Sequence, residues 1–588
     1  MKLTHIDWLV VAVYMAASLA LGLYHTRRAS SSIEEFFVSG RKLPWWLAGT
    51  SMVATTFSSD TPLYITGLVR TGGIYENWQW WCFLMTGMLS VVVFARLWKA
   101  AGVMTDVELT EMRYSGRAAP VLRAVKAVYF AVFIHTIIKA QVILAMAKIL
   151  DVAVGMDKWT AIIMSSAVTI CYALLSGYWG VVVTDFFQFI VAMVGAVIIA
   201  WAAIDKVGGI AALPVKIDAL YGPGNRFLDI LPPGDGGIFS IPVLTFIAYM
   251  GMSWWAKYSS DGGGVIVQRM VSCKNQRHAV GSVLYFNVAN YALRTWPWVL
   301  AAAASLVLYP NAVDHESVYP RMAMELLPAG VRGLVMASFF AAFMSTISTY
   351  LNLSSNYVIS DVYRRFVKKD ADERHYITAT RVSILVLSAI TAVVTYYADS
   401  IVGVFKFLIA FGSGTGLCFI MRWYWWRVNA WSEISAMAAS TVISSAIYVF
   451  LPKMPYYEKL LLIILFSNIV WVLVTLLTKP VEEQVLIKFY GRLRVGGIGW
   501  RAVEEKIREN RENRDSPENR DSPYFPDITP RGHLRTSILN WFYGCVFVYG
   551  LTVGLGLPFL NRPMEGALWL SVGLAGGLLF FRSFKGWD

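Results

Sequence analysis

The sequence predicts an all-α polytopic membrane protein with about fifteen transmembrane helices, and three observations support this fold class. Hydrophobic residues make up 57% and charged residues only 15% of the 588 residues, and the mean hydropathy is +0.53, far from a soluble average. Apolar stretches of about 20 residues, the length that an α-helix needs to cross a bilayer, recur along the chain. Basic residues gather in alternate loops, as cytoplasmic loops do.

The apolar stretches continue to the end of the chain, and no segment between them is long enough for a second globular domain. The first stretch lacks a small-residue cleavage site, so we expect a retained span rather than a signal peptide. The expected spans cover residues 7–25, 45–69, 79–98, 124–149, 159–176, 181–204, 241–258, 279–308, 332–358, 379–398, 401–421, 431–452, 457–478, 536–558 and 565–582.

The basic loops predict the orientation in the inner or plasma membrane. Arginine and lysine are concentrated near 27–42, 113–126, 269–277, 364–369 and 422–427, whereas the intervening loops, such as 151–158 and 308–332, are less basic. This pattern places the N-terminus outside and the C-terminus in the cytoplasm. The net charge of +13 therefore reflects topology, and no nucleic-acid partner is expected.

Composition divides the chain into five segments, which differ in their expected roles. Residues 479–535 are polar and repeat Glu-Asn-Arg-Asp-Ser-Pro at 512–523, which is typical of a partly disordered cytoplasmic linker. Before it, 481–508 is a candidate interfacial helix. The segments are a first peripheral span and loop (1–44), a transport core (45–427), two peripheral spans (428–478), the linker (479–535) and two C-terminal spans (536–588).

Two spans carry polar interruptions. The second contains Phe57-Ser58-Ser59-Asp60-Thr61-Pro62 at its middle, and the seventh contains a serine-, aspartate- and glycine-rich run over 253–264. Broken helices are tolerated at membrane depth only where they border a cavity or other protein. Interruptions five spans apart are typical of two inverted five-helix repeats that bind ions and solutes.

Ser345 and Thr346 are adjacent hydroxyls deep in the ninth apolar stretch. They either bond carbonyls of their own helix, as membrane serine and threonine often do, or line an ion site. The polar break at 55–61 favours the ion site. By contrast, the five scattered cysteines indicate neither a disulfide framework nor a metal site, and no enzyme motif is present, so no enzymatic activity is expected.

Several short motifs, taken in order, resemble the sodium/solute symporter family, which includes sodium–sugar, sodium–proline and sodium–sialic acid carriers. They are Phe36-Phe37-Val38-Ser39-Gly40-Arg41, Gly49-Thr50-Ser51, Gly177 through Thr184-Asp185 and Gln188, Gln268-Arg269, Ala342 to Thr346, and Ser360-Asp361-Val362-Tyr363. The resemblance implies a LeuT-type core of five plus five helices, extra peripheral helices, and alternating access.

The resemblance also implies a sodium site of three carbonyls and two hydroxyls. Positions 342, 345 and 346 lie at i, i+3 and i+4 and so share one helix face, and five hard oxygens suit an alkali cation. Asp185 matches an aspartate near the family's sodium path; a capping carboxylate at a helix N-terminus is the other interpretation. The implied sodium ligands are Ala54, Phe57, Ala342, Ser345 and Thr346.

We expect the solute to bind at the second-span break, near Ser58, Ser59, Asp60 and Thr61. This site departs from that of the sugar carriers, which have an acid–amide pair where this sequence has Ser59-Asp60-Thr61-Pro62. Asp60 and Lys139, in the fourth span, either form a structural ion pair or bind charged groups of the solute.

Trp254 and Trp255 of the seventh span either form a gate or stacking floor for the solute or belong to an interfacial aromatic belt. We expect a sodium-coupled symporter that imports a small polar organic solute, either sugar-like, amino-containing or carboxylate. A proton-coupled carrier and a membrane solute sensor are the alternatives. Expected partners are Na⁺, the solute and the lipid bilayer; the sequence makes no prediction of oligomeric state.

Overall fold

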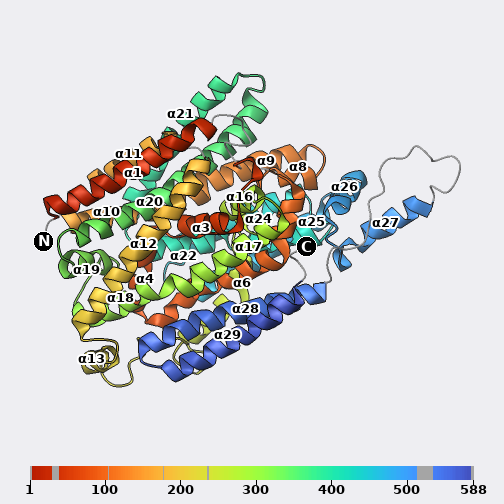
Figure 1. Ribbon diagram of the computed structural model, residues 1–588. Coiled ribbons are helices and arrows are strands. Elements are labelled where there is room, and N and C mark those ends of the chain that lie inside the picture. The colour runs from red at the N-terminus through yellow and green to blue at the C-terminus, as the bar shows by residue number, and fades with distance from the viewer. Residues whose placement is uncertain are drawn as a thin grey trace.

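The computed structural model shows a helical bundle, and the residues that it describes contain no strand (Figure 1). One isolated β-bridge joins Leu43 to Cys273, two residues that lie far apart in the sequence. The described residues are 3–29, 39–103, 105–175, 178–234, 237–512 and 534–584.

Eleven helices in the described part of the chain are long and apolar enough to cross a membrane, and each matches one expected span. They confirm a multi-pass α-helical protein. Their bounds are η2–α7 Ile74–Ala101, α9–α10 Ala118–Val154, α12 Gly180–Val207 (the helix itself begins at Tyr178), α17–α18 Gln276–Leu308, α20–η7 Val331–Val367, α21 Glu373–Tyr396, α22–α23 Ile401–Tyr424, α24 Ala430–Phe450, α25 Tyr456–Leu477, α28–η11 Arg535–Leu560 and α29 Pro563–Ser583.

The other four expected spans are helical too, although two of them are interrupted. The first is α1 (His5–Ala29) and the fifth is α11 (Lys158–Leu175). The second is split into α3 (Trp45–Thr56) and α4 (Asp60–Thr71). The seventh runs through α14 (Ile241–Ala248), the π-helical η5 (Tyr249–Ser253) and α15 (Trp254–Ala256), and resumes as α16 (Gly263–Ser272).

Helix α3 lies in the middle of the bundle, packed against α12, α17 and α20 (Figure 1). Small residues permit this close approach, as they do between membrane helices in general. At Gly49, an added Cβ would lie 2.6 Å from the Tyr285 ring of α17. The broken end of α3 is therefore enclosed by protein on several sides.

The loops segregate to two ends of the bundle as the basic pattern predicts. At one end, the Lys158 ammonium donates to the Ala398 carbonyl at 2.7 Å, and Ser400 Oγ donates to Glu316 at 2.9 Å. At the other end, the basic loops meet, and Arg113 Nε donates to the Arg422 carbonyl at 2.8 Å. Less basic and basic loops thus form separate faces.

The region expected to be a linker is partly folded. Its helices α26 (Glu483–Leu493) and α27 (Arg501–Glu512) lie beyond the bundle in Figure 1, yet α26 packs on α7 (Ala95–Ala101) and α8 (Leu109–Arg113). Apolar side chains such as Phe489, Trp500 and Ile507 are buried there, which explains the fold in a charge-rich segment. The rest of the repeat, 513–523, lies outside the described residues.

The last two spans, α28 and α29, run side by side along one edge of the bundle (Figure 1). Glycines bring their backbones together: a Cβ on Gly550 would lie 2.4 Å from the Gly573 Cα. Through α28 the pair also contacts α6 (Phe83–Leu89) and η6 (Val288–Leu293).

Candidate functional site

The break between α3 and α4 frees backbone carbonyls inside the protein. Residues 57–59 are not helical, and Phe57 is extended, with φ −108° and ψ 110°. The last carbonyls of a helix have no partner within it. Arg294 supplies one: its Nη1 donates to the Val53 carbonyl at 3.3 Å and its Nη2 to the Thr56 carbonyl at 3.2 Å. A buried cation thus stabilises the negative end of the half-helix.

Helix α20 faces this break with hydroxyl groups and a carbonyl. Thr346 Oγ1 donates to the Thr55 carbonyl at 3.0 Å, and Ser58 Oγ donates to the Ala342 carbonyl at 3.3 Å. Both bonds join α20 to the α3–α4 break, so Thr346 does not serve a carbonyl of its own helix. All five residues expected to bind sodium are buried: Ala54, Phe57, Ala342, Ser345 and Thr346.

Asp185 of α12 lies at the same junction and is fully buried. Ser345 Oγ donates to its Oδ1 at 2.5 Å, and Ser51 Oγ of α3 donates to its Oδ2 at 2.6 Å. The Arg269 guanidinium lies 3.7 Å from Oδ2 and donates to Thr55 Oγ1 at 3.0 Å. These side-chain contacts join the four helices α3, α12, α16 and α20. Asp185 lies about two turns inside α12, which begins at Tyr178, so it is not the helix cap that one interpretation proposed.

Asp60 and Lys139 do not form an ion pair. Gln141 Nε2 donates to Asp60 Oδ2 at 2.6 Å, whereas Lys139, 1% exposed, has no hydrogen-bond partner for Nζ in the described part of the chain. Successive helical residues are rotated by about 100°, so positions 139 and 141 point to nearly opposite sides of α10 (His135–Val154). The side of α10 that faces Asp60 carries the glutamine.

The neighbouring hydroxyls of the break also bond to protein groups. Ser59 Oγ donates to the Val142 carbonyl of α10 at 3.3 Å, and Thr61 Oγ1 accepts from the Ser58 amide at 3.4 Å. The polar run that was expected to contact solute therefore joins the break to α10 and α20.

The second break spans 257–262, inside the polar run that predicts it. Trp254 and Trp255 precede it and donate to carbonyls of their own span, those of Met250 at 3.1 Å and Gly251 at 2.7 Å. Trp254 also stacks on Trp541 of α28, with ring centroids 5.1 Å apart. A small cavity lies between the two breaks, and neither tryptophan is among the residues that line it.

A cavity of about 160 Å³ lies between the two breaks. Lys257 is the one lysine among the residues that line this cavity. Sequence reasoning did not single it out as a site residue, although a lysine at membrane depth, shortly before a triple glycine, was a usable signal. Its walls come from seven parts of the chain: Thr56; Phe83, Thr86, Gly87 and Ser90; Phe130 and His135; Lys257, Tyr258 and Ser259; Gly262 to Ile266; Val283, Phe286 and Tyr291; and Tyr350.

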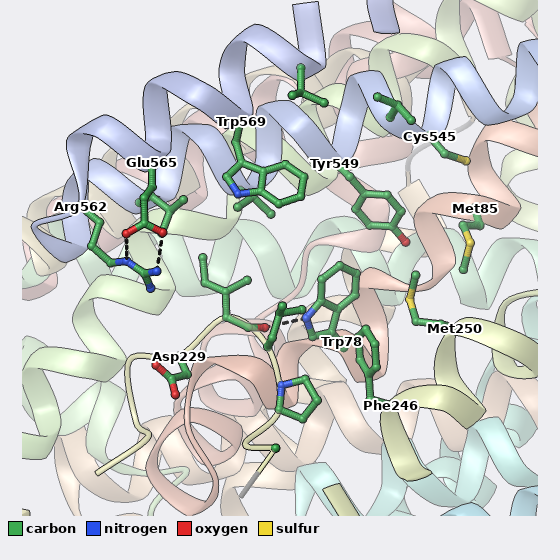
Figure 2. Close-up of a pocket in the computed structure, with 18 of the residues that line it drawn as sticks. Trp78, Met85, Asp229, Phe246, Met250, Cys545, Tyr549, Arg562, Glu565 and Trp569 are labelled. Atoms are coloured by element: carbon green, nitrogen blue, oxygen red, sulfur yellow. Dashed lines mark hydrogen bonds and ion pairs between the residues drawn. The ribbon is translucent and has the colours of Figure 1, made fainter. Parts of the chain in front are cut away.

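The larger cavity shown in Figure 2, about 760 Å³, lies elsewhere, between α28, α29 and the chain before α14. Arg562 and Glu565 lie at one end and Met85 and Cys545 at the other (Figure 2). None of the expected ion or solute residues lines it. Its place at the edge of the bundle separates it from the two breaks.

A helix broken at mid-length, whose freed carbonyls face the hydroxyls of a second helix, defines an ion-coupled membrane transporter. Residues 36–477 match the model of the sodium:solute symporter family, and the chain belongs to that family. The resemblance inferred from its motifs is thereby confirmed.

Similar proteins agree with this assignment. The chain is 28% identical to the sodium/glucose cotransporter 4 of Danio rerio over 541 residues, covering 82% of this chain and 80% of the relative. It is 23% identical to the sodium/glucose cotransporter of Vibrio parahaemolyticus over 512 residues, covering 82% and 92%. A solved Na⁺-coupled sialic acid symporter shares the fold, with a TM-score of 0.66, 20% identity, and coverage of 82% of this chain and 99% of that one. The protein is a sodium-coupled solute symporter, not an enzyme.

Proposed function

We propose that the protein imports a small polar organic solute together with sodium, by alternating access of a core built from five plus five helices. The observation that carries the proposal is the junction of the α3–α4 break with α20. Thr346 and Ser58 join the two across 3.0 and 3.3 Å. Sodium would bind to the carbonyls of Ala54, Phe57 and Ala342 and to the hydroxyls of Ser345 and Thr346.

The proposed ligands suit sodium chemically, because all five are hard oxygens and none is charged. A hydroxyl donates one hydrogen and keeps two lone pairs for accepting. Ser345 can therefore hold its bond to Asp185 and still present a lone pair to the ion. Asp185 adds a buried carboxylate next to the ligands, which favours a cation on that path.

The solute would bind beside the break, near Ser58, Ser59, Asp60 and Thr61. Lys139 supports a polar solute, because an unpartnered buried ammonium is costly unless a ligand group approaches it. Sodium and solute are coupled if each prefers the same state of the core, since allosteric coupling is reciprocal. The orientation, N-terminus outside and C-terminus cytoplasmic, is that which the basic loops predict.

Uptake by purified protein in liposomes tests this function. A mixture of isotope-labelled sugars, polyols, amino acids and carboxylates is offered under an inward sodium gradient or under an inward proton gradient without sodium. We expect at least one solute to accumulate with sodium, and Ser345→Ala/Thr346→Ala to abolish the accumulation. Accumulation that follows the proton gradient without sodium would contradict the proposal and favour a proton-coupled carrier.

A further inference from the structure

Lys257 begins the second break and lines the cavity between the two breaks. Its Nζ lies 4.5 Å from the centroid of the Phe83 ring. Within the part of the chain that the structure describes, it makes neither a hydrogen bond nor an ion pair. The residue is partly exposed, and a cation–π contact of this kind does not replace a counter-ion.

The other walls of the cavity add positive potential and no acid. Among its lining residues there is no aspartate or glutamate. The first turn of α16, Gly263 to Ile266, lines the cavity, and its N-cap residue, Gly262, provides no side chain to bond the free amides. Free amides at a helix N-terminus attract negative charge. The helix end and the ammonium thus act on the same space.

The two acids that lie in or beside the breaks, Asp261 and Asp60, do not line the cavity and have hydrogen-bond partners of their own. Asp261 accepts from the Trp423 indole at 2.8 Å and is paired with Arg422. Asp60 accepts from Gln141. Lys139, whose ammonium is buried without a partner, lies one helical turn from the cavity-lining His135, on the same side of α10. Positive charge therefore exceeds negative charge around the cavity.

We propose that the transported solute is a small organic carboxylate, and that Lys257 binds its carboxylate group in the cavity while the amides of α16 face the same group. This inference rests on the proposed symport and names its substrate class. A carboxylate would form an ion pair with the Lys257 ammonium. Transported together with one sodium ion, it would carry no net charge across the bilayer. An amine would meet like charge, and a neutral solute would leave the ammonium without a counter-ion.

Thermal unfolding of the detergent-purified protein in sodium chloride tests the proposal with matched probes. Acetate, L-lactate, pyruvate and D-gluconate are compared with acetamide, L-lactamide, pyruvamide and D-sorbitol, which keep the carbon skeleton and lose the charge. We expect at least one carboxylate to raise the melting temperature and its neutral partner not to. Lys257→Met should raise the half-saturating concentration about 10- to 100-fold, since hydrogen bonds between charged groups contribute about 1.5–3 kcal/mol.

Two further variants make the test specific. Lys257→Arg keeps the charge and should retain most of the affinity for the carboxylate. Lys158→Gln removes a lysine of a distant loop and should leave the half-saturating carboxylate concentration unchanged. The proposal is overturned if no carboxylate raises the melting temperature, if neutral partners act equally, or if Lys257→Met binds as the wild type does.

Sodium alone separates this inference from the function on which it rests. A melting temperature that rises with sodium in Lys257→Met shows that the variant is folded and that the ion site is intact. Failure of the carboxylates with that rise preserved refutes only the substrate class. If a carboxylate raises the melting temperature only when Lys257 is present, but equally in sodium and in choline, sodium coupling is refuted and the carboxylate site at Lys257 is supported.

Discussion

At the scale of single residues, Arg294 stabilises the broken end of α3 inside the protein. Its guanidinium bonds two of the freed carbonyls and lies over the rings of Phe57 and Trp298, 5.8 and 5.6 Å from their centroids. The planar guanidinium holds its donors in a fixed fork, so less conformational freedom is lost per hydrogen bond than with the flexible ammonium of a lysine. Arg294 thus stabilises the break by bonding carbonyls at the end of α3.

Replacing Arg294 should therefore destabilise the protein strongly. We expect Arg294→Met to lower the free energy of unfolding by about 3 kcal/mol, because its charge-assisted hydrogen bonds to the carbonyls of Val53, Thr56 and Asn290 are lost. Arg294→Lys should recover only part of this. Thermal unfolding in detergent measures the effect, with Arg562→Met as control: the side chain of Arg562 is 42% exposed and its ion pair contributes little. Equal melting temperatures for Arg294→Met and the control would contradict this role.

At the scale of helices, the second break is fixed against α23 (Gly416–Tyr424). Ser260 Oγ donates to the Gly416 carbonyl at 2.7 Å. A Cβ on Gly416 would lie 2.2 Å from the Ala256 carbonyl oxygen, so only glycine permits this approach of the two backbones. The position of the unwound segment, and of Lys257 within it, depends on that contact.

Gly416→Ala should push the second break away from α23 and lower both thermal stability and transport. Overpacking of this kind costs about 1–3 kcal/mol. The matched control is Gly251→Ala in the same span, where an added Cβ meets no atom within 4 Å. Melting temperature and initial uptake rate measure the two variants. A Gly416→Ala protein as stable and active as Gly251→Ala would show that the close contact does not hold the break.

The sequence predicts the positions of the breaks better than the partners of their side chains. Polar runs in apolar spans marked both breaks, because unwound backbone at membrane depth needs polar or protein surroundings. That Asp60 meets Gln141 and not Lys139 depends on how α10 is rotated, which hydrophobic periodicity leaves open when most of the helix is buried. Lys257 was overlooked for a similar reason: its neighbours in the cavity come from distant segments.

At the scale of the whole molecule, the basic and less basic loops lie on separate faces. Sequence composition alone predicts this arrangement, and it also explains the charge of +13. Composition was less informative for 483–507, where a few aromatic and aliphatic residues suffice to pack a charge-rich segment against the core.

The proposed orientation predicts which introduced cysteines react from outside the cell. The side chain of Asp399 is 93% exposed and that of Lys506 is 50% exposed, on opposite faces in our assignment. We expect a membrane-impermeant maleimide to label Asp399→Cys in intact cells and Lys506→Cys only after permeabilisation. The wild type is the control for background, since the four described native cysteines are buried. The reverse labelling pattern would invert the topology.

The central claim, a sodium site between the α3–α4 break and α20, is tested most directly by the melting temperature of the purified protein in sodium, potassium and choline chloride. Wild type is compared with Ser345→Ala/Thr346→Ala and with Ser338→Ala, a buried hydroxyl of α20 that bonds the carbonyl of Val335 in its own helix. We predict a rise specific to sodium in the wild type and Ser338→Ala that the double variant loses. Equal melting temperatures in the three salts, or an unchanged sodium effect in the double variant, would contradict the account.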